Sequence, residues 1–145
     1  DRARTLEALL EATDVLSIHA PLTSQTRGMI TGQQLARLKA GAVLVNTARG
    51  GVVDLDGVYD ALKSGHLAAA GLDVIPVEPP VEPVHKLMAA YREREPWLIG
   101  RLVFSPHSAF YSPEAEHDTR VKAAETMRAA LLSNNPQNVI TPDMD

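Results

Sequence analysis

Short aliphatic runs alternate with helix-like segments along most of this 145-residue chain. The runs are Val15-Leu16-Ser17-Ile18, Ala42-Val43-Leu44-Val45, Ala68–Ile75 and Leu102-Val103-Phe104. None of them alternates strictly between apolar and polar residues, which indicates strands that are covered on both faces. Strands that alternate with helices predict β-α-β units, and therefore an α/β fold built on a parallel sheet.

The expected helices lie between these runs and begin at residues that commonly cap helices. Their expected boundaries are Thr5 to Ala12, Thr31 to Gly41, Asp54 to Gly65 and Ser112 to Asn134. A further short apolar stripe between Val84 and Tyr91 predicts another helix. The prolines between Pro76 and Pro83 exclude a helix or a central strand there, so we expect a loop.

Composition excludes several classes of function. With 14 Lys and Arg against 18 Asp and Glu, the net charge is −4, so the chain has no basic surface for nucleic acid or an anionic membrane. It contains no cysteine, which excludes disulfides and thiol chemistry and fits a reducing compartment. No apolar run approaches the roughly 20 residues of a membrane span, and no signal-peptide pattern follows Asp1. We therefore expect a cytoplasmic protein.

Polar side chains lie at or just after the end of each of the four runs. His19, Arg49 and His107 follow the first, second and fourth runs, while Asp73 lies near the end of the third and Glu78 follows it. Parallel strands place such residues at one edge of the sheet, where ligands of this fold class bind. An arginine fork binds a carboxylate, and a histidine beside a carboxylate transfers protons near neutral pH. Together these groups suit reduction of a 2-keto acid, provided that a cofactor supplies the hydride.

Each of these residues also has a simpler structural explanation. Arg49 could be a surface side chain at a turn, and His107 taken alone could be structural. Glu78 could be exposed in the proline loop, Asp73 could cap a loop or a helix, and His19 could satisfy backbone groups. No group of His, Asp and Glu has the spacing of metal ligands, so we expect no metal site.

Four motifs occur in a characteristic order over nearly the whole chain. They are Asp14–Thr23 with Thr26, Leu38–Asp54, Gly71–Val74 with Glu78-Pro79, and Ser105-Pro106-His107. Together they resemble the signatures of the D-isomer-specific 2-hydroxyacid dehydrogenases. The resemblance implies the second half of a Rossmann-type parallel sheet with flanking helices, followed by a C-terminal helix that returns to the substrate domain.

The resemblance also implies catalytic roles. Arg49 would bind the substrate carboxylate, His107 would act as general acid and base, and Glu78 would orient that histidine. Phe110 would lie near the substrate, which would be a small 2-keto or 2-hydroxy acid. Which acid it is does not follow from the sequence.

A cofactor site is implied at the same edge. The stretches around Ala20 and Thr47-Ala48-Arg49 would line an NAD site, and Asp73 would contact the nicotinamide carboxamide, with His107 beside it. The choice between NAD and NADP stays open, because the residue that would contact the ribose is not among the motifs.

An alternative function comes from the segment after the histidine. Phe110 and Tyr111 stand where ordinary family members usually have small residues. This segment and the helix after it resemble the C-terminal binding protein branch, whose members are NAD(H)-dependent corepressors. The alternatives are thus an NAD-dependent oxidoreductase and an NAD(H)-sensing corepressor or oligomeric binding module.

No Gly-x-Gly-x-x-Gly pattern, the usual pyrophosphate-binding loop, occurs in the 145 residues. We therefore expect residues 1–112 to be the C-terminal part of an NAD-binding domain and residues 113–145 to be an interdomain helix and tail. We expect these residues alone to be inactive, and the whole protein to be a homodimer.

Overall fold

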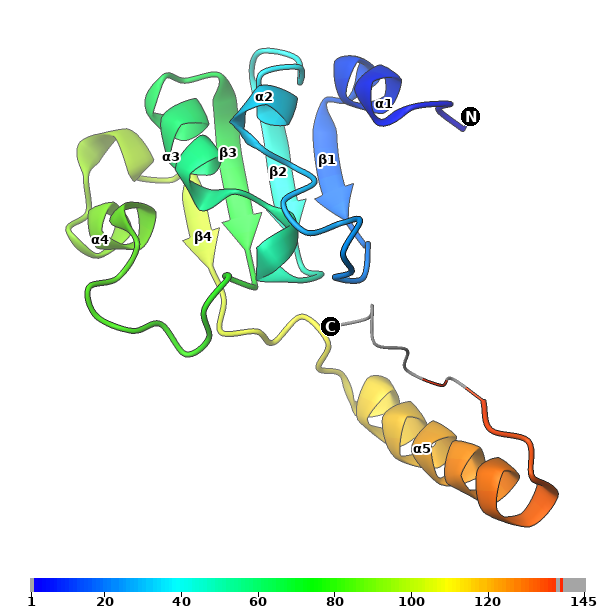
Figure 1. Cartoon of the computed structure of the whole chain (residues 1–145). Helices are drawn as coiled ribbons and strands as arrows, with labels where there is room; N and C mark the ends of the chain where they lie inside the picture. Colours follow the sequence, from blue (N-terminus) through cyan, green and yellow to red (C-terminus); the bar gives the residue numbers. More distant parts are fainter. Residues whose placement is uncertain (1, 138, 140–145) are drawn as a thin grey trace.

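The computed structural model describes residues 2–137 and 139, which contain a four-stranded sheet flanked by helices (Figure 1). The strands are β1 (Val15–Ile18), β2 (Ala42–Asn46), β3 (Leu67–Leu72) and β4 (Leu102–Phe104). Neighbouring strands are parallel, and their order in the sheet, β1-β2-β3-β4, is their order in the chain. The predicted α/β fold with a parallel sheet is confirmed.

Helices connect the strands and extend the chain at both ends. They are α1 (Leu6–Ala12), α2 (Gly32–Leu35), α3 (Leu55–Lys63), α4 (Lys86–Arg92) and α5 (Pro113–Ser133), with short 3₁₀ turns η1 (Gly50–Val52) and η2 (Pro96–Leu98). The predicted capping residues Thr31, Asp54 and Ser112 each accept a hydrogen bond from a backbone N–H in the first turn. Their side chains thereby satisfy donors that the helix itself leaves unpaired.

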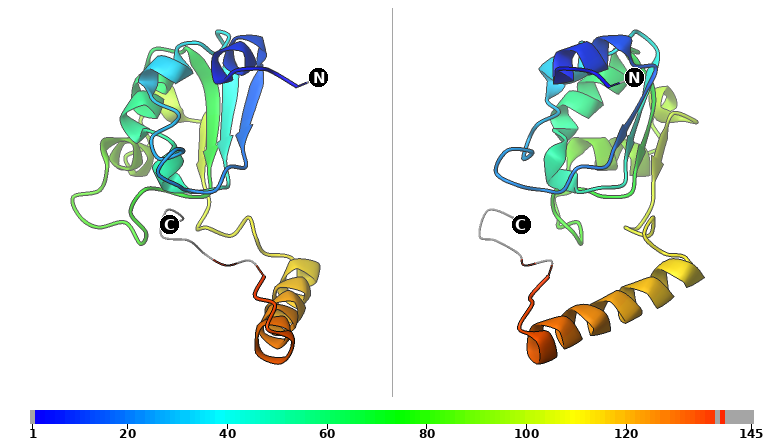
Figure 2. Two further views of the ribbon diagram at one scale, coloured as in Figure 1. Left: turned by 45° about the vertical axis from the view of Figure 1, so that its right-hand side comes forward. Right: turned by 90° about the vertical axis from the view of Figure 1, so that its right-hand side faces the viewer.

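The core lies between the sheet and the helices α2, α3 and α4, which cover the same face (Figure 2). Its side chains are aliphatic and alternate along the strands with outward-facing ones. The fully buried members include Leu35, Leu44, Val58, Leu62, Leu67 and Leu87. Each such burial stabilises the fold by about 1.5–3 kcal/mol, so this one layer holds the strands in place.

The opposite face of the sheet is uncovered by any helix of the described residues (Figure 2). Val15 is 59% exposed and Val103 is 63% exposed, while Val43 and Val45 are half-buried. The prediction that the strands are covered on both faces is therefore wrong for these residues. The aliphatic pattern is present on both faces, but only one face has a layer of helices packed against it.

Two predicted boundaries also differ from the structure. The third strand ends at Leu72 instead of Ile75, because the backbone N–H of Ile75 donates to the side chain of Glu78 at 2.7 Å instead of to a neighbouring strand. The helix after Thr31 ends at Leu35, well before Gly41. Beyond Leu35 the backbone hydrogen bonds join residues three apart in the sequence, and the side chain of Leu38 points into the core.

Helix α5 extends away from the sheet (Figure 1). None of its residues is buried, and Met127, Leu131 and Leu132 are 64%, 75% and 77% exposed. The division of the chain at residue 112 and the interdomain role of α5 stay predictions. The predicted tail falls partly on residues 138 and 140–145, which lie outside the described residues.

No helix in the described part of the chain combines the length and hydropathy needed to cross a membrane.

The crossing of α2 and α3 gives a stability prediction. A Cβ at Gly57 would lie 2.6 Å from the backbone nitrogen of Gly32, whereas a Cβ at Gly32 would lie 3.5 Å from the Cα of Gly57. We expect Gly57→Ala to lower the free energy of unfolding by about 1–3 kcal/mol, because the helices must move apart. The control Gly32→Ala should cost far less. Urea unfolding followed by circular dichroism measures both, and equal losses would contradict the close approach.

Candidate functional site

The loops after the four strands gather at one edge of the sheet, at the lower ends of the arrows in Figure 1. The turn after β2 carries Arg49, the loop after β3 carries Glu78, and the loop after β4 carries His107. Parallel pairing with sequential strand order accounts for this gathering, because every strand ends at the same edge.

Glu78 and His107 form a direct pair at this edge. Nδ1 of His107 lies 2.6 Å from Oε2 of Glu78, and Oε1 of Glu78 accepts from the backbone N–H of Ile75 at 2.7 Å. Because an ionised carboxylate only accepts hydrogen bonds, Nδ1 carries the hydrogen and Nε2 is left to give or take a proton. The side chain of His107 is 41% exposed, so a substrate can reach it.

The other glutamate of the proline loop is engaged elsewhere. Glu82 lies 2.7 Å from Nη1 of Arg92 and also accepts from the backbone N–H of Val84. The hydrogen bond from Arg92 and the one from Val84 hold the pKa of Glu82 below its ordinary value. Of the two glutamates in this loop, Glu78 is the one that meets the histidine.

Arg49 lies in the turn between β2 and η1. The side chain of Asn46, which is 1% exposed, donates to the carbonyl of Arg49 and accepts from the N–H of Ala48, both at 3.1 Å. Nη1 of Arg49 donates to the carbonyl of Ala48 at 2.8 Å. The exposed guanidinium borders a hollow of about 400 Å³ that Ala20, Thr47 and Ala48 also line.

The turn that carries Arg49 touches the loop that carries Glu78. A Cβ at Gly50 would lie 2.0 Å from the carbonyl carbon of Ile75 and 2.4 Å from the nitrogen of Pro76. No side chain larger than hydrogen fits there. Gly50 therefore sets how closely the arginine turn and the glutamate loop approach each other.

Asp73 lies just beyond the end of β3 and is 5% exposed. Its carboxylate accepts hydrogen bonds from Ser105, Ser108 and Ala109, which belong to the loop around His107. Burial raises the pKa of Asp73, but these three hydrogen bonds and the nearby His107 outweigh it and hold the pKa below its ordinary value. Asp73 is therefore ionised at neutral pH, and it caps a loop, which is one of the two structural explanations left open above.

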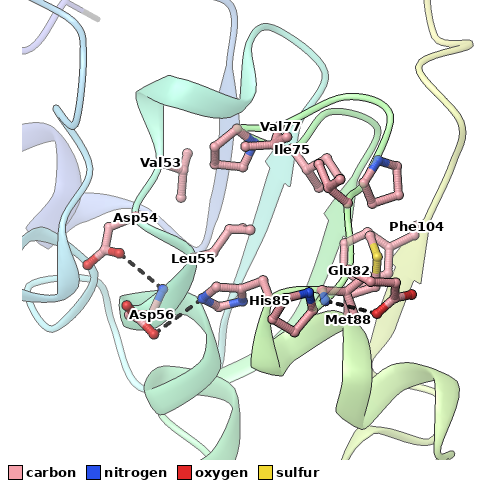
Figure 3. A pocket seen from close by; sticks show the side chains of 15 residues that line it. Val53, Asp54, Leu55, Asp56, Ile75, Val77, Glu82, His85, Met88 and Phe104 are labelled. Atoms are coloured by element: carbon pink, nitrogen blue, oxygen red, sulfur yellow. Dashed lines mark hydrogen bonds and ion pairs between the residues drawn. The ribbon is translucent and has the colours of Figure 1, made fainter.

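Two cavities flank the proline loop. One, of about 410 Å³, is bounded by Glu78 and His107 together with Met88 and Phe104. The other, of about 470 Å³, lies between the start of α3 and the loop and is shown in Figure 3. Met88 and Phe104 also line the second cavity, so the two share a wall.

The polar groups around the second cavity are already paired. His85 caps α4 through its Nδ1, and its Nε2 lies 3.2 Å from Asp56 (Figure 3). Asp56 also pairs with Lys86 at 2.8 Å, and the hydrogen bonds and charges of Lys86 and His85 outweigh the opposing effect of burial and hold the pKa of Asp56 below its ordinary value. Both ring nitrogens of His85 are thus engaged, whereas Nε2 of His107 is available, so the histidine suited to proton transfer borders the first cavity.

Phe110 and His19, the remaining candidates from the sequence, do not line the cavity beside Glu78 and His107. Phe110 is 69% exposed, and its ring centroid lies 6.2 Å from that of His107. His19 was expected to satisfy backbone groups, but its Nε2 lies 2.8 Å from the hydroxyl of Ser17. The described residues contain no cluster of His, Asp and Glu that could hold a metal ion.

Sequence reasoning missed three residues that shape this site. Asn46, Gly50 and Ser105 hold or permit the loop conformations described above. A signal for Asn46 was present, because a polar residue directly after an aliphatic strand is a candidate for a buried turn anchor. Nothing in the sequence indicated that Gly50 lies against the backbone of Ile75 and Pro76.

Residues 1–109 match the family described as D-isomer specific 2-hydroxyacid dehydrogenase, NAD binding domain. A glyoxylate reductase from Korarchaeum cryptofilum is 43% identical over 130 residues, which cover 88% of this chain and 34% of that protein. A D-3-phosphoglycerate dehydrogenase from Bacillus subtilis is 45% identical over 123 residues, which cover 85% of this chain and 21% of that protein. The chain thus spans about a third or less of the length of these two curated relatives.

The fold leads to the same family. A D-isomer specific 2-hydroxyacid dehydrogenase from Xanthobacter autotrophicus Py2, solved in complex with NADPH and MES, superposes with a TM-score of 0.73 at 32% identity. The similarity covers 94% of this chain and 52% of that one. The family match, the parallel sheet and the similarity to a solved structure all agree with the resemblance that the motifs carry. The chain belongs to the D-isomer-specific 2-hydroxyacid dehydrogenase family, and its residues 1–109 match the NAD-binding domain of that family.

Proposed function

We propose that the protein is an oxidoreductase that interconverts a 2-keto acid and the corresponding 2-hydroxy acid with a nicotinamide cofactor. The observation that carries this proposal is the bond between His107 and Glu78, which leaves Nε2 of the imidazole available for proton transfer. Arg49 follows β2, the strand that pairs with β3, at the same edge of the sheet. Its guanidinium can bind a carboxylate through two N–H groups. The substrate class follows from these groups, since a 2-keto acid presents a carboxylate next to a carbonyl.

The residues then divide the reduction between them. Arg49 binds the substrate carboxylate through two of its N–H groups, and its charge polarises the adjacent keto oxygen. As the keto carbon gains a hydride, Nε2 of His107 gives its proton to the keto oxygen, which becomes the hydroxyl of the product. Glu78 stabilises the charged imidazole before the transfer and keeps the ring in one orientation.

The chain fits one end of the cofactor. Ala20 and Ala48 are small, half-buried residues beside the hollow at Arg49, so they leave room for a flat ring. We propose that Ala20, Thr47 and Ala48 line the nicotinamide end, with Asp73 nearby. The bound cofactor supplies the hydride. Since the 145 residues contain no Gly-x-Gly-x-x-Gly pattern, we expect other residues to bind the cofactor phosphates. NAD and NADP both remain compatible with these groups.

The two curated relatives compared above have the names of enzymes, which supports the oxidoreductase. Nothing in these comparisons supports the corepressor alternative, and the likeness to the C-terminal binding protein branch stays a prediction. We also propose a cytoplasmic homodimer. The absence of cysteine fits a reducing compartment, and the exposed valines of the uncovered sheet face and Met127, Leu131 and Leu132 of α5 are apolar side chains that association would cover.

Removing the proton donor should abolish most of the activity. In the full-length protein, we expect His107→Ala to lower kcat by about 10²–10⁴-fold, because proton transfer to the keto oxygen then depends on water. Glu78→Gln should lower kcat less, since the imidazole stays in place without its charged partner. NADH oxidation with glyoxylate, hydroxypyruvate and pyruvate measures these rates. His117→Ala, which removes an exposed histidine on α5, is the control. Full turnover by His107→Ala would contradict the proposed role.

Replacing the arginine fork should affect substrate binding most strongly. We expect Arg49→Lys to raise KM for the keto acid about tenfold to a hundredfold, because a lysine cannot make the bidentate contact. Arg37→Lys is the matched control, since Arg37 pairs with Glu11 on the surface at 2.9 Å. Steady-state kinetics over keto-acid concentration measure the change. An unchanged KM in Arg49→Lys would show that the carboxylate binds elsewhere.

A further inference from the structure

Asp73 holds the loop of the proposed proton donor at three points. Its Oδ1 accepts from the hydroxyl of Ser105 at 2.5 Å and from the backbone N–H of Ser108 at 2.9 Å. Its Oδ2 accepts from the backbone N–H of Ala109 at 2.9 Å. Ser105 precedes His107 in the sequence, and Ser108 and Ala109 follow it. The carboxylate therefore binds the loop on both sides of the histidine.

The backbone around His107 needs such support. His107 has a φ of +51°, in the left-handed region that side chains other than glycine adopt at an energetic cost. Its backbone N–H donates to the carbonyl oxygen of Asp73 at 2.9 Å. Main chain and side chain of Asp73 therefore both hold the conformation from which the imidazole reaches Glu78.

An ionised carboxylate is the group that suits these contacts. All three partners donate hydrogen bonds, and a carboxylate accepts on both oxygens. An asparagine would place an NH₂ group against one of the donors. Because Asp73 is 5% exposed, water has little access to replace the lost contact.

We propose that Asp73 is a positioning residue that fixes the left-handed loop at His107 and thereby holds the imidazole in its bond to Glu78. This role rests on the proposed function, since it concerns the geometry of the same proton transfer. It is separable from the nicotinamide contact that the family resemblance implies for Asp73. A positioning role changes the rate of proton transfer, whereas a cofactor contact changes the affinity for NADH.

The test compares two variants of the full-length protein. We expect Asp73→Asn to lower kcat by about 10²-fold, since a displacement of about 1 Å at a reacting group has that effect. The dissociation constant of NADH, measured by fluorescence titration, should change little. In ¹H NMR, the downfield resonance of the imidazole Nδ1–H bonded to Glu78 should be lost. Ser105→Ala removes one of the three contacts, so it should lower kcat less while keeping the same NADH affinity.

The outcomes separate the possible roles of Asp73. If Asp73→Asn keeps the Nδ1–H resonance and loses NADH affinity instead, the positioning role is overturned. If Asp73→Asn does not fold, Ser105→Ala decides: a reduced kcat at constant NADH affinity supports the proposal, and an unchanged kcat overturns it. If the wild-type protein reduces no keto acid, the proposed function fails, and the Nδ1–H resonance in Asp73→Asn still tests the positioning.

Discussion

The candidate site depends most directly on the close approach of Gly50 to the backbone of Ile75 and Pro76. Arg49 precedes this contact by one residue, and Glu78 follows Ile75 by three. Since β2 and β3 are paired neighbours, the absence of a side chain at Gly50 lets their two loops lie against each other. A carboxylate-binding group and a proton-transfer pair thereby share one edge of the sheet.

Two buried polar side chains hold the remaining loops. Asn46, at the end of β2, holds the turn that carries Arg49, and Asp73, just after β3, holds the loop that carries His107. Burying polar groups is costly unless they are hydrogen-bonded, and the described residues contain no buried side-chain N or O atom without a partner. The aliphatic sheet thus supplies a rigid base, and paired polar groups at its edge fix the loops.

The sequence was sufficient to predict the strand positions and the edge at which Arg49, Glu78 and His107 gather. Aliphatic runs separated by capped helices determine a parallel sheet, and a parallel sheet determines the edge. The sequence was insufficient where contacts between residues far apart in the chain determine burial or the conformation of a loop. The valines at 43 and 45 have the same sequence pattern whether or not helices cover them. Asp73 acts on a loop that begins 32 residues later, which no local pattern reveals.

The most direct test of this account is the catalytic efficiency of Gly50→Ala in the full-length protein. A Cβ there would meet fixed backbone at 2.0 Å, so the arginine turn and the glutamate loop must separate, and kcat/KM for keto-acid reduction should fall by about 10²-fold. In the control Gly51→Ala, the added Cβ meets the movable side-chain ends of Leu22 at 3.2 Å and of Arg27 at 3.6 Å, and activity should stay close to that of the wild type. A folded Gly50→Ala protein with wild-type kcat/KM would contradict the account.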